Sequence, residues 1–342
     1  MARTDPAVYP DRDSRQRQRD GKVARVAIIG TPRSGNCWLM HLLSRVYDVP
    51  ALFPSVPANV DWARLPAECV LVLHWRFVGT GLKTRLAENG FRTIVLARHP
   101  LDVLISVLHH TLHYPKEDWL YNESGTEEPI RGASPCSTAF LDYATGPRGA
   151  TLLSVSREWW SSPAVGRARY EELVRDPHVE LMRLVTAIGI PCRRPVAEEV
   201  AGADLAGLRQ LHPERKYHFW KGQPGLWRSL LPTREARLIA DAHPQVFAEL
   251  DYDCDPDPNL DLRQADANWL QFMRLSLAEM DTQREGLRAR LAPFEDIGPL
   301  ALGVARSLRG LSLRYPRLSA AFKWSIRAGV THTVPAPELE PT

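Results

Sequence analysis

The sequence of 342 residues lacks the features that mark a membrane protein or a secreted protein. No run of about eighteen apolar residues occurs, so no membrane-spanning helix is expected. Residues 1–22 mix arginine and aspartate where a secretory signal would place an apolar core, and they show no periodicity. These absences predict a cytoplasmic protein that begins with a disordered leader over residues 1–22.

Cysteine pairs and excess charge are also missing. The five cysteines are scattered without any C-x-x-C pair, which argues against a zinc site and against a disulfide framework. The 43 basic and 40 acidic residues leave a formal charge of +3, too small for a nucleic-acid coat. No nucleic-acid partner is therefore expected, and any anion must be bound by individually placed residues.

Short apolar runs alternate with helical patterns along the first half of the chain. Runs over 23–30, 70–74 and 91–98 read as strands, and helical patterns begin at Gly35 and Pro100. A further strand is predicted over 168–173, and helices over 138–144 and 151–160. This order predicts an α/β fold with a central parallel sheet flanked by helices in three layers. Ligands bind such sheets beyond the carboxyl ends of the strands, where Gly30, His74 and Arg98 fall.

The turn after the first strand has the spacing of a phosphate-binding loop. Gly30 and Gly35 match G-x-x-x-x-G, but Asn36 and Cys37 replace the Lys and the Ser or Thr of a nucleotide triphosphatase. The cation stands instead at Arg33. Because the hydroxyl that would hold Mg²⁺ is absent, the loop favours a metal-free phosphate or phosphosulfate ligand over magnesium ATP.

A second anion-binding pattern follows the strand that ends near residue 98. Arg98 stands at the mouth of a helix and Ser106 lies about two turns further along it. A guanidinium and a hydroxyl that converge can hold one phosphate. The alternative is that Arg98 pairs with Asp102 and that Ser106 is exposed, and the sequence leaves both open.

Four segments in order resemble the sulfotransferase family that uses 3′-phosphoadenosine 5′-phosphosulfate (PAPS). Residues 31–38 look like its 5′-phosphosulfate loop and residues 98–106 like its 3′-phosphate segment. Residues 168–177 are similar to its strand ending in Tyr-Glu-Asp-Leu, and residues 221–228 to its Lys-Gly-x-x-Gly-x-Trp loop. The resemblance implies a P-loop-like fold, PAPS as co-substrate with no metal, and transfer of a sulfo group to a hydroxyl or, less favoured, an amine.

The resemblance also implies a role for each matching residue. Arg33 would contact the oxygen that bridges sulfate and phosphate, and Trp38 would stack on adenine with Tyr170 at its edge. The 5′-phosphate would lie against the backbone of Ser34, Gly35, Asn36 and Cys37. The 3′-phosphate would be held by Arg98, Ser106, Lys221 and Gly222.

His74 matches the general base of the family. A neutral imidazole there could take the proton from the acceptor hydroxyl as it attacks sulfur in line with the departing phosphate. His109, His110 and His113 are alternatives that we expect on a helix surface. The catalytic residues are thus predicted to be His74 and Arg33.

The sequence departs from the family pattern at two further positions. Val72 replaces a lysine that cytosolic members carry, and Trp220 stands where an arginine is common. Arg76, Lys83 and Lys216 are candidates to replace the missing lysine. The departures keep two alternatives open, a P-loop kinase that uses Mg-ATP on a small molecule and a non-catalytic nucleotide-binding relative.

The remaining segments predict the domain layout. The catalytic domain is expected over residues 23–258, a helical C-terminal extension over 259–334 and a disordered tail over 335–342. The segment 114–135 reads as a long surface loop that could act as a lid, and with residues 53–61 it is expected to line the acceptor site.

The C-terminal extension carries apolar positions at helical spacing over 262–291, a pattern also compatible with a homodimer. Residues 297–334 carry six basic residues and no acidic one. This tail either packs on the catalytic domain or contacts an anionic membrane surface or glycan. It tilts the expected acceptor towards a carbohydrate or a lipid-linked molecule, with other small molecules kept open.

Overall fold

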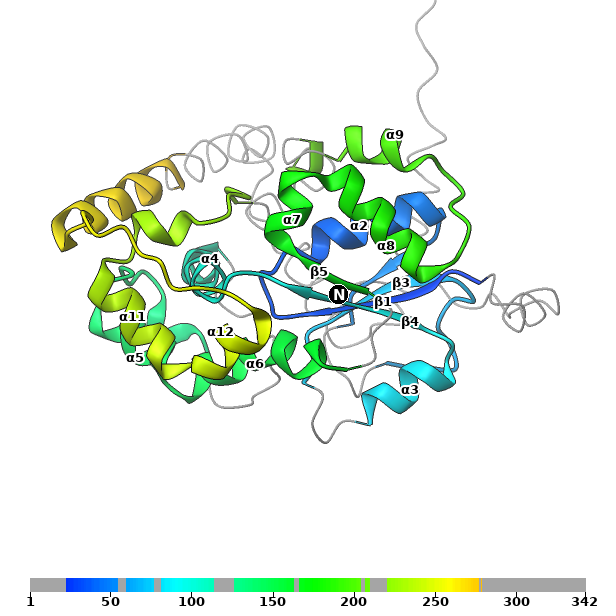
Figure 1. Cartoon of the computed structure of the whole chain (residues 1–342), viewed down its shortest axis with the longest axis horizontal. Coiled ribbons are helices and arrows are strands. Elements are labelled where there is room, and N and C mark those ends of the chain that lie inside the picture. The colour runs from blue at the N-terminus through cyan, green and yellow to red at the C-terminus, as the bar shows by residue number, and fades with distance from the viewer. Residues whose placement is uncertain are drawn as a thin grey trace, which may run out of the picture. The chain divides into compact units, whose positions relative to one another are not determined.

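A computed structural model of the chain describes residues 23–54, 60–76, 81–113, 126–162, 166–203, 207–209, 220–276 and 278 (Figure 1). The chain divides into two compact units, residues 1–271 and residues 272–342, and the fold below is that of the first. Several predicted segments lie outside the described residues. They are the leader, the tail, most of the C-terminal extension, Lys216, residues 55–59 and the first half of the 114–135 loop.

The core of the first unit is a five-stranded parallel sheet in the order β2-β3-β1-β4-β5. Its strands are β1 (Arg25–Gly30), β2 (Ala51–Leu52), β3 (Cys69–Leu73), β4 (Arg92–Ala97) and β5 (Gly166–Arg169). Every residue of β1 and β3 is buried. Burial on both faces explains why these strands read as continuous apolar runs and not as alternating patterns.

Helices cover both faces of the sheet (Figure 1). They are α2 (Asn36–Tyr47), α3 (Leu82–Glu88), α4 (Pro100–His113), α5 (Thr138–Thr145), α6 (Pro147–Trp160), α7 (Tyr170–Arg175), α8 (Pro177–Ile188), α9 (Val196–Ala201), α11 (Thr233–Ala242) and α12 (Pro244–Leu250). The apolar faces of α2 and α8 cover one side of the sheet, α2 over β1 and β3 and α8 over β5, whereas α3 and α6 lie on the other side. The predicted three-layer α/β fold is confirmed.

The expected strand over residues 168–173 is wrong in its second half. The strand β5 ends at Arg169, and Tyr170 is the first residue of helix α7. Acidic residues in the first turn of α7, Glu171 and Glu172, favour a helix start because they complement the helix dipole. Tyr170 therefore lies at a strand-to-helix junction on the carboxyl edge of the sheet.

The described part of the predicted surface loop, residues 126–135, lies partly at the surface and is attached to the interior at a few buried positions. Residues 128–130 form a short 3₁₀ helix, η2 (Glu128–Ile130), in which Ile130 is fully buried. Glu127 is buried and accepts a 2.7 Å hydrogen bond from Nε of Arg148 on α6. This buried ion pair and the apolar contact of Ile130 attach the segment to the protein interior.

The start of the predicted C-terminal extension, residues 259–271, belongs to the first unit. Residues 262–276 are helical, and within the first unit Ala265 and Trp269 are buried. Asp266 accepts a hydrogen bond from Ser134, and the amide of Asn268 donates to the carbonyl of Ser229 at 2.8 Å. Within the described ranges, no helix is both long and apolar enough to cross a membrane.

Candidate active site

The loop between β1 and α2 has the backbone shape of an anion-binding turn. Arg33 and Gly35 adopt left-handed conformations with φ of 70° and 94°, and α2 begins directly after them. A helix N-terminus directs backbone N–H groups and a partial positive charge at whatever lies before it. Gly30 has no room for a side chain, because a Cβ would lie 2.7 Å from the carbonyl oxygen of Leu96.

The side chain of Asn36 closes this loop and does not point out of it. Its amide nitrogen donates to the carbonyl of Thr31 at 2.9 Å, and the residue is buried. The N–H of Ser34 is also used within the loop, at 3.2 Å from the same carbonyl. The unusual Asn36 thus has a structural reason, and the 5′-phosphate contacts expected here are those of the backbone.

Ser156 on α6 holds the first residue of the loop, and the sequence reading missed it. Its hydroxyl accepts from the N–H of Thr31 at 2.7 Å and donates to the carbonyl of Leu96 at 2.8 Å. The hydroxyl of Thr31 accepts in return from the N–H of Ser156 at 3.1 Å. Ser156 therefore ties the carboxyl ends of β1 and β4 together across the sequence.

Replacing Gly35 with alanine should lower both stability and donor affinity. The φ of 94° strains any side chain, and the new Cβ would lie 2.4 Å from Cδ2 of Tyr170. Strain of this kind costs about 1–3 kcal/mol, and the displaced ring adds to it. Thermal unfolding and calorimetric titration with the nucleotide product measure the two effects.

Gly81→Ala is the matched control for that experiment. Gly81 also has a positive φ, 59°, but a Cβ there meets nothing within 4 Å. Gly81→Ala should lose only the stability that the backbone strain costs, and it should keep full nucleotide affinity. Equal losses of unfolding temperature in the two variants, with unchanged affinity in both, would contradict the packing of Gly35 on Tyr170.

Three predicted phosphate ligands meet between the loop and α4. The Nε of Arg33 donates to the hydroxyl of Ser106 at 3.1 Å, and Nη1 of Arg98 donates to the carbonyl of Arg33 at 3.1 Å. Ser106 is buried, and the carboxylate of Asp102 is occupied by other groups. The structure therefore rules out the alternative in which Arg98 pairs with Asp102 and Ser106 is exposed.

Two buried donors in this region lack a partner among the described residues. They are the Nε of Arg98 and the hydroxyl of Ser34. A buried polar group without a hydrogen bond is destabilising, and the penalty is larger for a charged group. An orphaned N–H on a guanidinium that is bonded to the Arg33 carbonyl fits an anionic ligand such as the 3′-phosphate.

Tyr170 contacts Trp38 of α2, Arg98 directly upstream of α4, and the loop that contains Lys221. Its hydroxyl donates to the carbonyl of Gly222 at 3.0 Å, and its ring lies 4.5 Å beneath the guanidinium carbon of Arg98. Trp38 meets the same ring edge-on at 6.2 Å. Burial raises the pKa of Tyr170, so its phenol stays protonated and remains a donor. The residues expected around adenine and the 3′-phosphate are thus neighbours.

His74 follows β3 directly and faces the phosphate loop. Its Nδ1 lies 2.7 Å from the carbonyl oxygen of Gly30. Since a carbonyl can only accept, the proton of a neutral ring is on Nδ1 and the lone pair is on Nε2. Phe53 packs edge-on against the imidazole at 5.2 Å. This tautomer is the one that a base acting through Nε2 needs.

The histidines of α4 are not on a helix surface as expected. His109 and His110 are buried, and the His109 ring stacks on the indole of Trp220 at 3.9 Å. Burial lowers the pKa of His109 to about 2, helped by the charges of His113 and Arg33. A group that binds a proton so weakly is a poor general base at neutral pH, and Trp220 has a packing role where an arginine is common.

Arg76 is an unsuitable replacement for the lysine that Val72 displaces. Its guanidinium is bound by the buried carboxylate of Glu158 on α6, through Nε at 2.8 Å and Nη2 at 2.6 Å. An arginine held in this way already has its counter-charge. Lys83 lies on the exposed face of α3.

Comparison with known proteins finds one matching family model and several solved structures of similar fold. The sequence model described as "Sulfotransferase domain" matches residues 24–242. The crystal structure of mouse sulfotransferase SULT7A1 complexed with PAP superposes with a TM-score of 0.50 at 17% identity, covering 66% of this chain and 84% of that one. Retinol dehydratase in complex with androsterone and inactive cofactor PAP gives a TM-score of 0.42 at 15% identity, covering 72% and 88%. No curated protein sequence matches.

Proposed function

The chain belongs to the sulfotransferase domain family, and from this premise we propose that it moves the sulfo group of PAPS to an acceptor hydroxyl with His74 as general base. The enzyme is a sulfotransferase and PAPS is its co-substrate. The observation that carries the proposed base is the 2.7 Å contact between Nδ1 of His74 and the Gly30 carbonyl, which leaves the lone pair on Nε2.

Each end of the donor has proposed ligands in the chain. The backbone of residues 34–37 at the start of α2 would hold the 5′-phosphate. Arg98, Ser106, Lys221 and Gly222 would hold the 3′-phosphate, which the orphaned Nε of Arg98 supports. Trp38 and Tyr170, in edge-on contact, would bind the adenine.

Sulfo transfer forms one S–O bond as another breaks. In the proposed step, Nε2 of His74 accepts the proton of the acceptor hydroxyl as its oxygen attacks sulfur. The bond between sulfur and the bridging phosphate oxygen breaks, and the products are a sulfate ester and PAP. Arg33 stabilises the charge that develops on the bridging oxygen, an electrostatic effect that a preorganised cation supplies well.

The acceptor is proposed to be a hydroxyl of a carbohydrate, a lipid-linked molecule or another small molecule, with an amine less favoured. Residues 53–61 and 114–135 are the proposed acceptor loops, and the packing of Phe53 on His74 supports the first of them. Three further points stay predictions: a catalytic domain over residues 23–258, membrane contact by the basic tail, and a homodimer through the helix near residues 269–291.

Labelled donor tests the proposal directly. The protein is incubated with PAPS labelled in the sulfo group and a fractionated cell extract, and labelled products are identified by mass spectrometry. A sulfate ester that forms with wild type and not with His74→Ala supports the proposal. PAP binding without any labelled product over a broad acceptor panel would favour a non-catalytic relative.

Chelation should leave the reaction unchanged. The loop has Asn36 and Cys37 where a nucleotide triphosphatase carries the Lys and the hydroxyl that coordinate phosphate and Mg²⁺. Excess EDTA is therefore expected to preserve turnover, whereas a metal-dependent transfer would lose at least about a hundredfold. ATP consumption that requires Mg²⁺ would instead establish the kinase alternative.

A further inference from the structure

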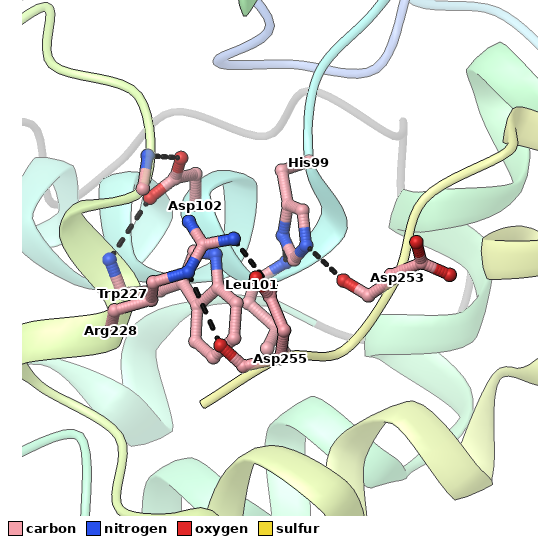
Figure 2. Close-up of polar contacts among 8 residues, drawn as sticks. His99, Leu101, Asp102, Trp227, Arg228, Asp253 and Asp255 are labelled. Carbon is pink, nitrogen blue, oxygen red and sulfur yellow. Dashed lines mark hydrogen bonds and ion pairs between the residues drawn. The ribbon is translucent and has the colours of Figure 1, made fainter. Parts of the chain in front are cut away.

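Asp102 makes contacts that the proposed chemistry does not use. It lies in the first turn of α4 and is 1% exposed. One carboxylate oxygen accepts the N–H of Gly225 at 2.6 Å and the other accepts the N–H of Trp227 at 3.1 Å (Figure 2). Both donors belong to the segment 220–229, which includes the 3₁₀ helix η4 (Leu226–Ser229) and is called the lysine loop below.

His99, the residue directly before α4, contacts the lysine loop as well. The ring of His99 stacks on the indole of Trp227 with centroids 4.9 Å apart and planes 17° apart. His99 is itself fixed, because its Nε2 donates to the carbonyl of Asp253 at 3.0 Å and its Nδ1 accepts the N–H of Leu101 (Figure 2). The first turn of α4 thus holds the downstream half of the lysine loop by polar and aromatic contacts.

The upstream half of the lysine loop carries two proposed ligands of the 3′-phosphate, Lys221 and Gly222. The other two are Ser106, which lies on α4, and Arg98, which lies two residues before α4 begins. Contacts at both ends of the loop set the position of one pair relative to the other. At the upstream end Trp220 stacks on His109 of α4 and Gly222 accepts from Tyr170. Asp102 attaches the downstream end with a buried carboxylate, and charge-assisted hydrogen bonds of this kind are the strong ones.

We propose that Asp102 is a positioning residue for recognition of the 3′-phosphate, acting by holding the lysine loop against α4. The inference rests on the proposed function, since it needs the 3′-phosphate to lie between Arg98 and Lys221. Asp102 touches no substrate in this scheme. It determines how well the enzyme separates PAPS and PAP from nucleotides that lack the 3′-phosphate.

The charge of Asp102 gives the proposal a sign that can be tested. A carboxylate near a bound phosphate repels it. The Asp102 charge reaches this region, since it adds to the effect of burial in raising the pKa of Tyr170. If charge alone mattered, Asp102→Asn would tighten binding of PAP. The positioning role predicts the reverse, because asparagine offers one oxygen acceptor and turns an NH₂ donor towards the second N–H.

The experiment measures the dissociation constants of PAP and 5′-AMP by calorimetry for wild type and Asp102→Asn. Wild type should bind PAP much more tightly than 5′-AMP. The variant should lose at least about tenfold of that preference while its affinity for 5′-AMP stays within about twofold. Glu180→Gln is the control, because Glu180 is a buried acid on α8 that accepts a hydrogen bond from Nε of Arg183 and has no proposed contact with either substrate.

The outcomes separate the inference from the proposed function. If wild type binds PAP and 5′-AMP equally, the proposed 3′-phosphate site is wrong. If wild type discriminates and a folded Asp102→Asn keeps or improves the preference, only the role of Asp102 is wrong.

Hydrogen exchange on wild type keeps the test open should Asp102→Asn not fold. PAP should slow exchange of the Gly225 and Trp227 amides more than 5′-AMP does, because the 3′-phosphate draws the loop onto α4. Equal protection by the two nucleotides would overturn the inference.

Discussion

His74→Ala is expected to lower kcat by about 10²–10⁴-fold, the usual range for loss of a general base, while binding of PAP is unchanged. Nothing else in the proposed mechanism replaces the lone pair on Nε2, since the pKa of His109 is far too low and Arg76 is bound by Glu158. PAP affinity should survive because no donor contact is assigned to the imidazole. Single-turnover rates and calorimetry measure the two quantities.

His74→Asn separates chemistry from structure. The asparagine amide can still donate to the Gly30 carbonyl, as Nδ1 of His74 does, but it cannot accept a proton at neutral pH. It should therefore be as inactive as the alanine variant and more stable. His243→Gln is the matched control, because His243 is also buried and its Nε2, which the longer glutamine amide can replace, bonds the carbonyl of Ala144 at 2.6 Å in a different part of the fold. Substantial kcat in His74→Asn would remove His74 from the mechanism.

The carboxyl edge of the sheet could be predicted from sequence because its signals are local. β1, β3 and β4 read as apolar runs, as buried parallel strands do; β1 ends with Gly30, whereas His74 and Arg98 directly follow β3 and β4. The spacing of Gly30 and Gly35 likewise predicts the turn into α2. Once the strands are parallel and adjacent, Gly30, His74 and Arg98 must lie on one edge.

The supports of the site could not be predicted, because their partners are far apart in sequence. Asp102 and Gly225 are separated by 123 residues, and Ser156 and Thr31 by 125. Asp102 reads locally as an ordinary acidic residue in a first helical turn. No periodicity or spacing encodes a carboxylate that binds two distant N–H groups, so tertiary packing alone determines this contact.

Burial of polar residues explains what the sequence did not reveal on α4 and in the 114–135 loop. Glutamate and arginine are mostly exposed in proteins and histidine is intermediate, so sequence alone does not predict that such residues are buried. His109 is instead covered by Trp220, and Glu127 is covered with Arg148 as an ion pair. His109 and Glu127 each pack with a residue from another segment, Trp220 and Arg148, that sequence spacing does not identify.

Arg33→Ala is expected to lower kcat by about 10²–10³-fold, the range seen when one preorganised group loses contact with developing charge. Its effect on PAP affinity should be much smaller, because the backbone of residues 34–37 and the 3′-phosphate ligands remain. Arg33→Lys should keep most of the activity, since an ammonium can supply the same charge. A fall in PAP affinity as large as the fall in kcat would assign Arg33 to ground-state binding instead.

Arg33→Gly gives the sharper comparison, because it separates activity from the conformation of the loop. Arg33 has a φ of 70°, a left-handed conformation that costs a residue with a side chain roughly 1–2 kcal/mol and costs glycine little. The glycine variant should therefore unfold at a temperature no lower than that of Arg33→Ala and be equally inactive. Arginine at this position lowers stability relative to glycine, so its presence indicates that the guanidinium has a function. Activity in the glycine variant close to that of wild type would show that the loop backbone, and not the Arg33 side chain, stabilises the departing phosphate.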